Sequence, residues 1–155
     1  MTTLSISKTP YKIAYAVAGD KFGEIKAYGT VALTSGDENK RLIEWERAVQ
    51  NLINQFKPDF IVTHLLNRDR TLKKDIERVT EIRTILRLLA EKNKAFYAEF
   101  KTSGWEKRLL ERTPTALRKI KYIQNLYDNE LTDVDIADAI ILADGVAQQN
   151  LQIGK

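Results

Sequence analysis

The chain has 155 residues, of which 43% are hydrophobic and 30% charged, with seven glycines and three prolines, a composition that excludes disordered and fibrous classes. The absence of cysteine excludes disulfides, thiolate metal sites and a cysteine nucleophile, and no stretch reaches the ~20 apolar residues of a membrane span. The net charge is +4. From the length, the lack of cysteine and the lack of a membrane span, we expect one cytoplasmic domain at residues 1–150 and a short C-terminal tail at 151–155.

The first third of the chain alternates apolar and polar residues with a period of two. This pattern predicts three strands, at 3–7, 12–18 and 26–33. Pro10 interrupts the pattern after the first strand, and residues 19–23 form a loop of hairpin length bounded by two glycines. Because short turns join antiparallel neighbours, we expect a three-stranded antiparallel meander.

From Ser35 onward the hydrophobic period becomes helical, and Pro58 ends the pattern. The apolar stripe of this helix consists of Leu42, Trp45, Val49, Leu52, Ile53 and Phe56. The β-branched run at 59–66 then predicts a buried strand, followed by a helix at 71–92 and a strand at 94–100. The second half of the sheet is therefore expected to alternate strands with helices.

Basic residues are concentrated in the segment 101–121, where two shorter helices are predicted at 103–110 and 115–127, on either side of Pro114. The segment contains seven basic and two acidic residues, a local surplus of +5, and the basic ones are Lys101, Lys107, Arg108, Arg112, Arg118, Lys119 and Lys121. Clustered lysine and arginine favour a phosphate backbone through counterion release, although a solvated helical face has the same pattern.

Aromatic residues lie among these basic charges, and they allow two interpretations. Trp105, Tyr122 and Tyr127 could stack on unpaired bases or pack in the core, and we favour the core for the two tyrosines.

The last helix is predicted from Thr132 to about Ala147, with Thr132 as N-cap and Asp135 completing a capping box. Asp138 is harder to explain by capping, because its helical neighbours are apolar and the helix must therefore be buried. Asp135 lies one turn away on the same face, so two carboxylates repel each other there. A divalent cation would relieve that repulsion, whereas capping and the helix dipole alone could account for Asp135.

The order of three strands, helix, strand, helix, strand and closing helices resembles the ribonuclease H fold, most closely its RuvC-type Holliday junction resolvase branch. The segment Asp135-Ile-Ala-Asp-Ala139 matches that family's last helix, and Pro58-Asp59 precedes the fourth strand as in the family. The first strand and turn, Leu4 to Val17, are similar too. The resemblance implies a mixed five-stranded sheet, three antiparallel strands and two further ones, flanked by helices.

The resemblance also implies phosphodiester hydrolysis by two Mg²⁺ ions held by four carboxylates. Asp135 and Asp138 correspond to two of these, and they are our predicted catalytic residues and metal ligands, with Mg or Mn as the ion. Ser7 stands where the first-strand aspartate is expected, and His64 where the fourth-strand glutamate is expected. A neutral hydroxyl cannot bridge two metal ions, so nuclease activity is expected to be weakened or lost. The carboxylates that could compensate are Asp20, Glu24, Asp69 and Glu99.

His64 is the single histidine of the chain, and three roles remain open for it. The commonest role at a strand end is a hydrogen-bonded structural residue. His64 could also bind zinc or manganese together with Asp135 and Asp138. A nucleophilic triad with Ser7 is the third possibility, although no Gly-x-Ser-x-Gly elbow surrounds that serine.

The sequence therefore predicts a RuvC-like protein that binds branched or structured nucleic acid, with DNA favoured, through its basic segment. The resemblance implies a homodimer, because a junction is engaged with two-fold symmetry. One alternative is an inactive protein-interaction module on the same fold. Another is an active Mg- or Mn-dependent endonuclease with a rearranged site.

Overall fold

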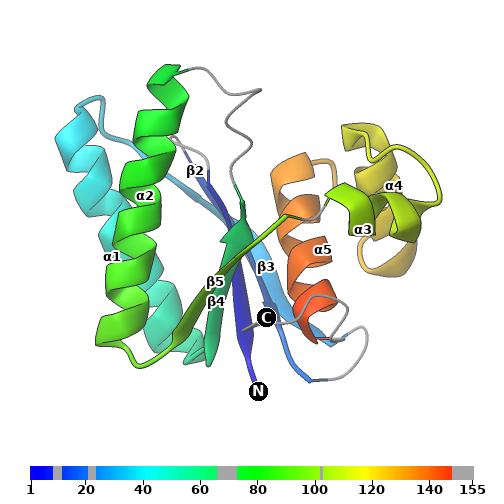
Figure 1. Cartoon of the computed structure of the whole chain (residues 1–155), viewed down its shortest axis with the longest axis horizontal. Coiled ribbons are helices and arrows are strands. Elements are labelled where there is room, and N and C mark those ends of the chain that lie inside the picture. The colour runs from blue at the N-terminus through cyan, green and yellow to red at the C-terminus, as the bar shows by residue number, and fades with distance from the viewer. Residues whose placement is uncertain (9–11, 21–23, 66–72, 102, 148–155) are drawn as a thin grey trace.

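A five-stranded mixed sheet forms the centre of the molecule, in the order β3-β2-β1-β4-β5 (Figure 1). The computed structural model describes residues 1–8, 12–20, 24–65, 73–101 and 103–147. The strands are β1 (Thr3–Lys8), β2 (Lys12–Ala18), β3 (Ile25–Ala32), β4 (Phe60–His64) and β5 (Phe96–Phe100). β1, β2 and β3 pair antiparallel, while β4 runs parallel to both β1 and β5. The predicted mixed sheet is confirmed.

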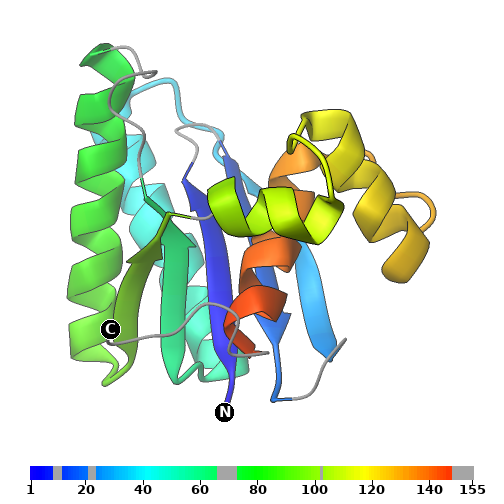
Figure 2. The same cartoon turned by 45° about the vertical axis from the view of Figure 1, so that its right-hand side comes forward.

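Helices cover both faces of this sheet. They are α1 (Glu38–Phe56), α2 (Lys73–Lys92), α3 (Ser103–Leu110), α4 (Ala116–Leu126) and α5 (Val134–Ala147). α1 and α2 pack on one face and α5 on the other, with α3 and α4 beyond α5 (Figure 2). α1 begins three residues later than predicted because the Asp37 carboxylate accepts a hydrogen bond from the Lys40 amide at 3.0 Å and caps the helix.

The α1–α2 face holds the larger hydrophobic core, as the apolar stripe predicts. Trp45 is 1% exposed and packs with Leu4, Ile6 and Ile13 of the first two strands. Because strand side chains alternate between faces, Ser5 and Ser7 of β1 point the other way, toward α5. No helix of the described ranges is long and apolar enough to cross a membrane.

Small side chains bring α5 close to the sheet. Ala16 and Ala18 of β2 are buried against Ala139 and Ile140 of α5. On the neighbouring strand, Val62 of β4 packs on Leu142 of α5. The alternation along β4 then places His64, two residues on, on the same face. The ends of β1 and β4 are thus both directed to the side of the sheet that α5 covers.

Candidate functional site

Ser7 and His64 lie level with each other at the ends of two neighbouring parallel strands. The register pairs Ser5 of β1 with Val62 of β4, and each predicted site residue follows two positions later. Ser7 is nearly buried, whereas the His64 side chain is 27% exposed. The fold therefore brings together the two positions at which the family resemblance expects carboxylates.

The N-terminus of α5 is capped by Asp133, so the prediction that Thr132 caps it is wrong. The Asp133 carboxylate accepts a hydrogen bond from the Asp135 amide at 2.8 Å, and its carbonyl accepts the first helical bond, from Ala137, at 3.1 Å. Thr132 is exposed and lies one residue too early. Aspartate and threonine are both good N-caps, and the chain uses the one that also reaches a lysine.

Lys12 of β2 forms ion pairs with two carboxylates at this end of α5. Its Nζ lies 2.6 Å from Asp133 Oδ2 and 3.1 Å from Asp135 Oδ2. The hydrogen bond to Asp133 raises the pKa of Lys12, despite an opposing effect of burial. Although burial alone raises the pKa of Asp133, the bond from Lys12 and the backbone bonds of the cap outweigh it, and the net pKa is lowered. Asp135 is thus held in an ion pair.

A second lysine joins α3, α4 and α5. Lys119 Nζ of α4 lies 2.8 Å from Asp138 Oδ1 of α5 and 3.2 Å from Glu106 Oε2 of α3. On the other side of Glu106, His64 Nε2 is 3.6 Å from Oε1. Glu106 is 3% exposed, which makes it the most deeply buried member of the cluster. Figure 1 shows α3, α4 and α5 side by side, next to the ends of the strands.

The electrostatic balance of Lys119 favours its charged form. Burial by itself lowers the pKa of this ammonium group, but the hydrogen bond to Asp138 and the charges of Asp138 and Glu106 outweigh that effect. The net pKa is raised above the ordinary value of lysine. The Lys119 side chain is 17% exposed, so the positive charge belongs to the interior of the site rather than to the surface.

Comparisons with known proteins were informative at the level of structure. No protein-family model matches the sequence, and no curated protein sequence matches it. Thermus thermophilus RuvC in complex with a Holliday junction substrate superposes with a TM-score of 0.78 at 12% identity, over 97% of this chain and 95% of that one. The yeast mitochondrial Holliday junction resolvase Ydc2 gives 0.70 at 16% identity, over 94% and 77%. The fowlpox virus resolvase with junction DNA gives 0.64 at 15% identity, over 98% and 100%.

This chain has the RuvC-like ribonuclease H fold. The superpositions extend over almost its whole length, and the strand order and closing helix agree with the arrangement expected from the resemblance. Sequence identities of 12–16% establish the shared fold but not a shared activity. The chemistry of the site must therefore be judged from the residues of this chain.

On the RuvC-like fold, the predicted site residues separate into two groups. Ligand atoms of His64, Glu106 and Asp138 all lie within 4.8 Å of one another. Asp135 is not part of that group, and its carboxylate is paired with Lys12 instead. Glu106 had appeared in the sequence only as a negative charge within the basic segment. Its helical spacing from Leu109, which packs on the core, is the signal that could have predicted its burial.

The carboxylates proposed to compensate for the lost ligands do not do so where the structure describes them. Glu99 accepts a hydrogen bond from Tyr97 and pairs with Arg83 of α2, on the opposite face of the sheet. Asp20 pairs with the N-terminal amine at 3.0 Å, at the other end of the strands. Glu24 lies at that same end, against Gly19. Asp69 falls outside the described residues.

The basic segment presents most of its charge to solvent on α3, α4 and the residues around them. Its exposed members are Lys101, Lys107, Arg108, Arg112 and Lys121. Arg118 is half-buried and donates a hydrogen bond from Nη1 to the carbonyl of Thr113 at 2.8 Å. Lys119 is committed to the site. The interleaved aromatics, Trp105, Tyr122 and Tyr127, pack against the α5 core, which supports packing over base stacking.

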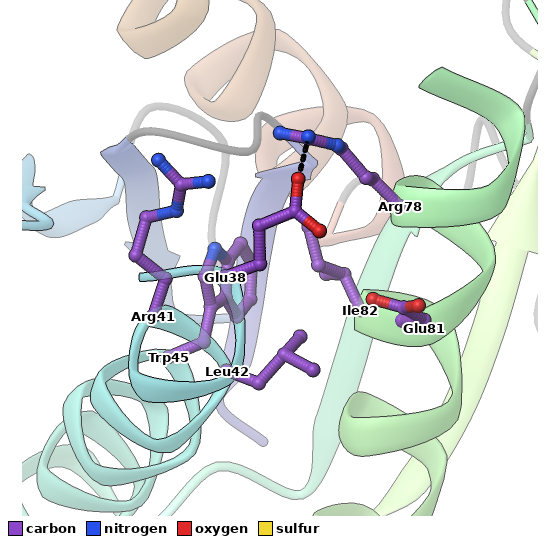
Figure 3. Close-up of a pocket in the computed structure, with 7 residues that line it drawn as sticks. All are labelled: Glu38, Arg41, Leu42, Trp45, Arg78, Glu81 and Ile82. Carbon is purple, nitrogen blue, oxygen red and sulfur yellow. Dashed lines mark hydrogen bonds and ion pairs between the residues drawn. The ribbon is translucent and has the colours of Figure 1, made fainter. Parts of the chain in front are cut away.

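A separate pocket lies between α1 and α2, on the opposite face of the sheet. Figure 3 shows Glu38 and Arg78 joined by an ion pair above Trp45 and Ile82, which line the pocket together with Leu42. The pocket lies at the same end of the sheet as Ser7 and His64, but it is separated from them by the sheet itself. It contributes nothing to the acidic site.

The residues present do not fit the two divalent cations implied by the family resemblance. The position expected to bridge both ions holds the uncharged Ser7. Two ammonium groups, those of Lys12 and Lys119, already lie within bonding distance of all four nearby carboxylates. A Mg²⁺ site needs several oxygen ligands around the ion, and one oxygen of each of these carboxylates already faces a lysine ammonium group at 2.6–3.2 Å.

Proposed function

We propose that this protein binds branched DNA as a RuvC-like nucleic-acid-binding protein and does not hydrolyse it by the two-metal mechanism. The observation that carries the proposal is the RuvC-like fold with exposed lysine and arginine on α3 and α4, next to the strand ends. Two of the superposed resolvases are described with Holliday junction DNA bound. A homodimer in the cytoplasm is the expected working form, because a four-way junction has two-fold symmetry.

The site supports binding without cleavage. Hydrolysis by two metal ions requires one ion to activate water and the other to stabilise the leaving oxygen. Here lysine ammonium groups contact the carboxylates instead, and a lysine cannot lower the pKa of a bound water as a metal ion does. The positive charge of the neighbouring helices still attracts phosphate, because five of the seven basic side chains are exposed.

Binding can be tested with a four-way junction and a duplex of matched sequence, using the double variant Lys107→Glu, Arg112→Glu. We expect its junction affinity to fall at least about tenfold at moderate salt, because two phosphate-binding cations are reversed. The matched control is Lys57→Glu, Lys92→Glu, which makes the same change of charge at exposed positions on the α1–α2 side. The control should retain at least half of the wild-type affinity.

Other outcomes would favour the alternatives. Equal loss in both double variants would show a general effect of net charge and contradict a specific DNA surface. No junction binding at low salt would favour a protein-interaction module. Cleavage of labelled junction DNA in Mg²⁺ or Mn²⁺, abolished by Asp138→Asn, would favour an endonuclease with a rearranged site.

A further inference from the structure

We propose that the ammonium groups of Lys12 and Lys119 are the resident cations of this site, and that Lys119 masks a transition-metal site formed by His64, Glu106 and Asp138. The wild-type protein would then take up no divalent cation here. This inference does not depend on DNA binding, since it concerns the ligands of the acidic site alone. The two proposals can therefore fail separately.

Each lysine performs the neutralising role of a cation between two carboxylates. Lys12 contacts Asp133 and Asp135 at 2.6 Å and 3.1 Å, and Lys119 contacts Asp138 and Glu106 at 2.8 Å and 3.2 Å. Without these contacts the carboxylates would repel one another more strongly, and the buried Glu106 would lose a compensating positive charge. Two ammonium groups thus occupy, with covalently attached charge, positions between carboxylates that exchangeable ions would otherwise take, and they offset two of the four negative charges.

A divalent ion cannot enter while Lys119 keeps this position. The ammonium nitrogen lies at hydrogen-bond distance from two of the three ligands that such an ion would use. Binding would require Lys119 to leave a place where its side chain is only 17% exposed, or else to remain beside an ion of the same sign. Both alternatives oppose uptake, the first through lost ion pairs and the second through repulsion at short range.

Removing the ammonium group leaves a suitable set of ligands behind. One imidazole nitrogen and two carboxylates, with ligand atoms within 4.8 Å of one another, come from three different elements. His64 Nε2 is buried and makes no hydrogen bond within the described residues, so it is available as a ligand. An imidazole with carboxylates suits Mn²⁺ and Zn²⁺, whereas Mg²⁺ prefers oxygen ligands alone.

The test compares wild type with Lys119→Met, which keeps the aliphatic length and removes the charge. Titrations with Mn²⁺, Zn²⁺ and Mg²⁺ are followed by calorimetry and by thermal unfolding against a chelator. We expect wild type to show no binding and no change in Tm. We expect Lys119→Met to bind one Mn²⁺ or Zn²⁺ per chain more tightly than Mg²⁺ by about tenfold or more, with a raised Tm.

Three further variants make the result specific. Lys119→Arg keeps the positive charge and should bind no metal. Lys119→Met combined with Asp138→Asn, or with His64→Ala, should lose the metal-dependent rise in Tm. A folded Lys119→Met that binds neither ion would overturn the proposal. Stoichiometric Mn²⁺ binding by the wild type, lost in Asp138→Asn, would also overturn the proposal. This measurement can be made even if Lys119→Met does not fold.

Discussion

Behind the acidic site, at the scale of single residues, Tyr127 and Asp144 form a polar contact within the α5 core. The tyrosine hydroxyl donates to Asp144 Oδ2 at 2.9 Å, and Asp144 is only 6% exposed. Burial, followed by the bond to Asp144 and its negative charge, raises the pKa of Tyr127. The neutral tyrosine is therefore favoured by folding, and its stabilising effect depends on pH.

The raised pKa of Tyr127 predicts a loss of stability in alkali. Because the folded pKa lies above the unfolded value of about 10, the contribution is complete below pH 10 and is lost as pH rises beyond it. Tyr127→Phe should reduce the free energy of unfolding by about 1–2 kcal/mol at neutral pH through the lost hydrogen bond. The variant should also show a shallower decline above pH 10 in urea unfolding. An unchanged slope would contradict this assignment.

The sequence indicates which residues could form the site, but not how their charges are paired. Asp138 was predicted because a carboxylate in an apolar helix is locally conspicuous, and His64 because the family resemblance expects a glutamate at its position. Lys12 and Asp133 are 121 positions apart, and no local pattern connects them. Glu106 and Lys119 had been counted among the charges of a basic surface. Pairing across elements is decided by packing, which periodicity does not encode.

At the scale of elements, α5 depends on small neighbours and on its first residue. Ala16 and Ala139 are fully buried where the helix meets β2, which allows the close approach of helix and sheet. The order and type of the described strands and helices were predictable, because their hydrophobic periods are clear. The ends of the helices were less predictable, because adjacent residues such as Thr132 and Asp133 can both act as caps.

The cap of α5 gives a direct test that distinguishes two adjacent residues. Asp133→Ala removes the hydrogen bond to the Asp135 amide and the ion pair with Lys12, so it should lower the free energy of unfolding by about 1–2 kcal/mol. Thr132→Ala, the matched control, should change it by less than about 0.5 kcal/mol, because Thr132 is exposed. Chemical denaturation measures both. The reverse order would restore Thr132 as the cap.

At the scale of the whole molecule, charge is distributed in two layers. The inner layer consists of four carboxylates, and the ion pairs of Lys12 and Lys119 offset two of their negative charges. The outer layer is the group of exposed lysines and arginines on and around α3 and α4, in a chain whose net charge is +4. DNA would meet only the outer layer, so its binding should follow the rules of phosphate contacts.

This distribution predicts that junction binding responds strongly to monovalent salt. A protein that contacts about six phosphates loses about 10³-fold in affinity between roughly 50 mM and 200 mM salt, because condensed counterions are released. Fluorescence anisotropy with a labelled four-way junction measures the dependence of log K on log salt. A junction affinity that stays flat over this range would contradict binding through the exposed cations.

Lys119 connects the two layers, because it forms ion pairs in the inner layer while its helix, α4, carries part of the exposed positive charge. A charge supplied by an ion can be diluted or chelated, but one supplied by a side chain is present in every folded copy. The orientation of α3 and α4 on α5 is therefore independent of the magnesium concentration of the cell. A single codon change at Lys119 would replace the ammonium group, which is always present, by a metal ion taken from the surroundings. The packing of α3 and α4 on α5 would then depend on the supply of that metal.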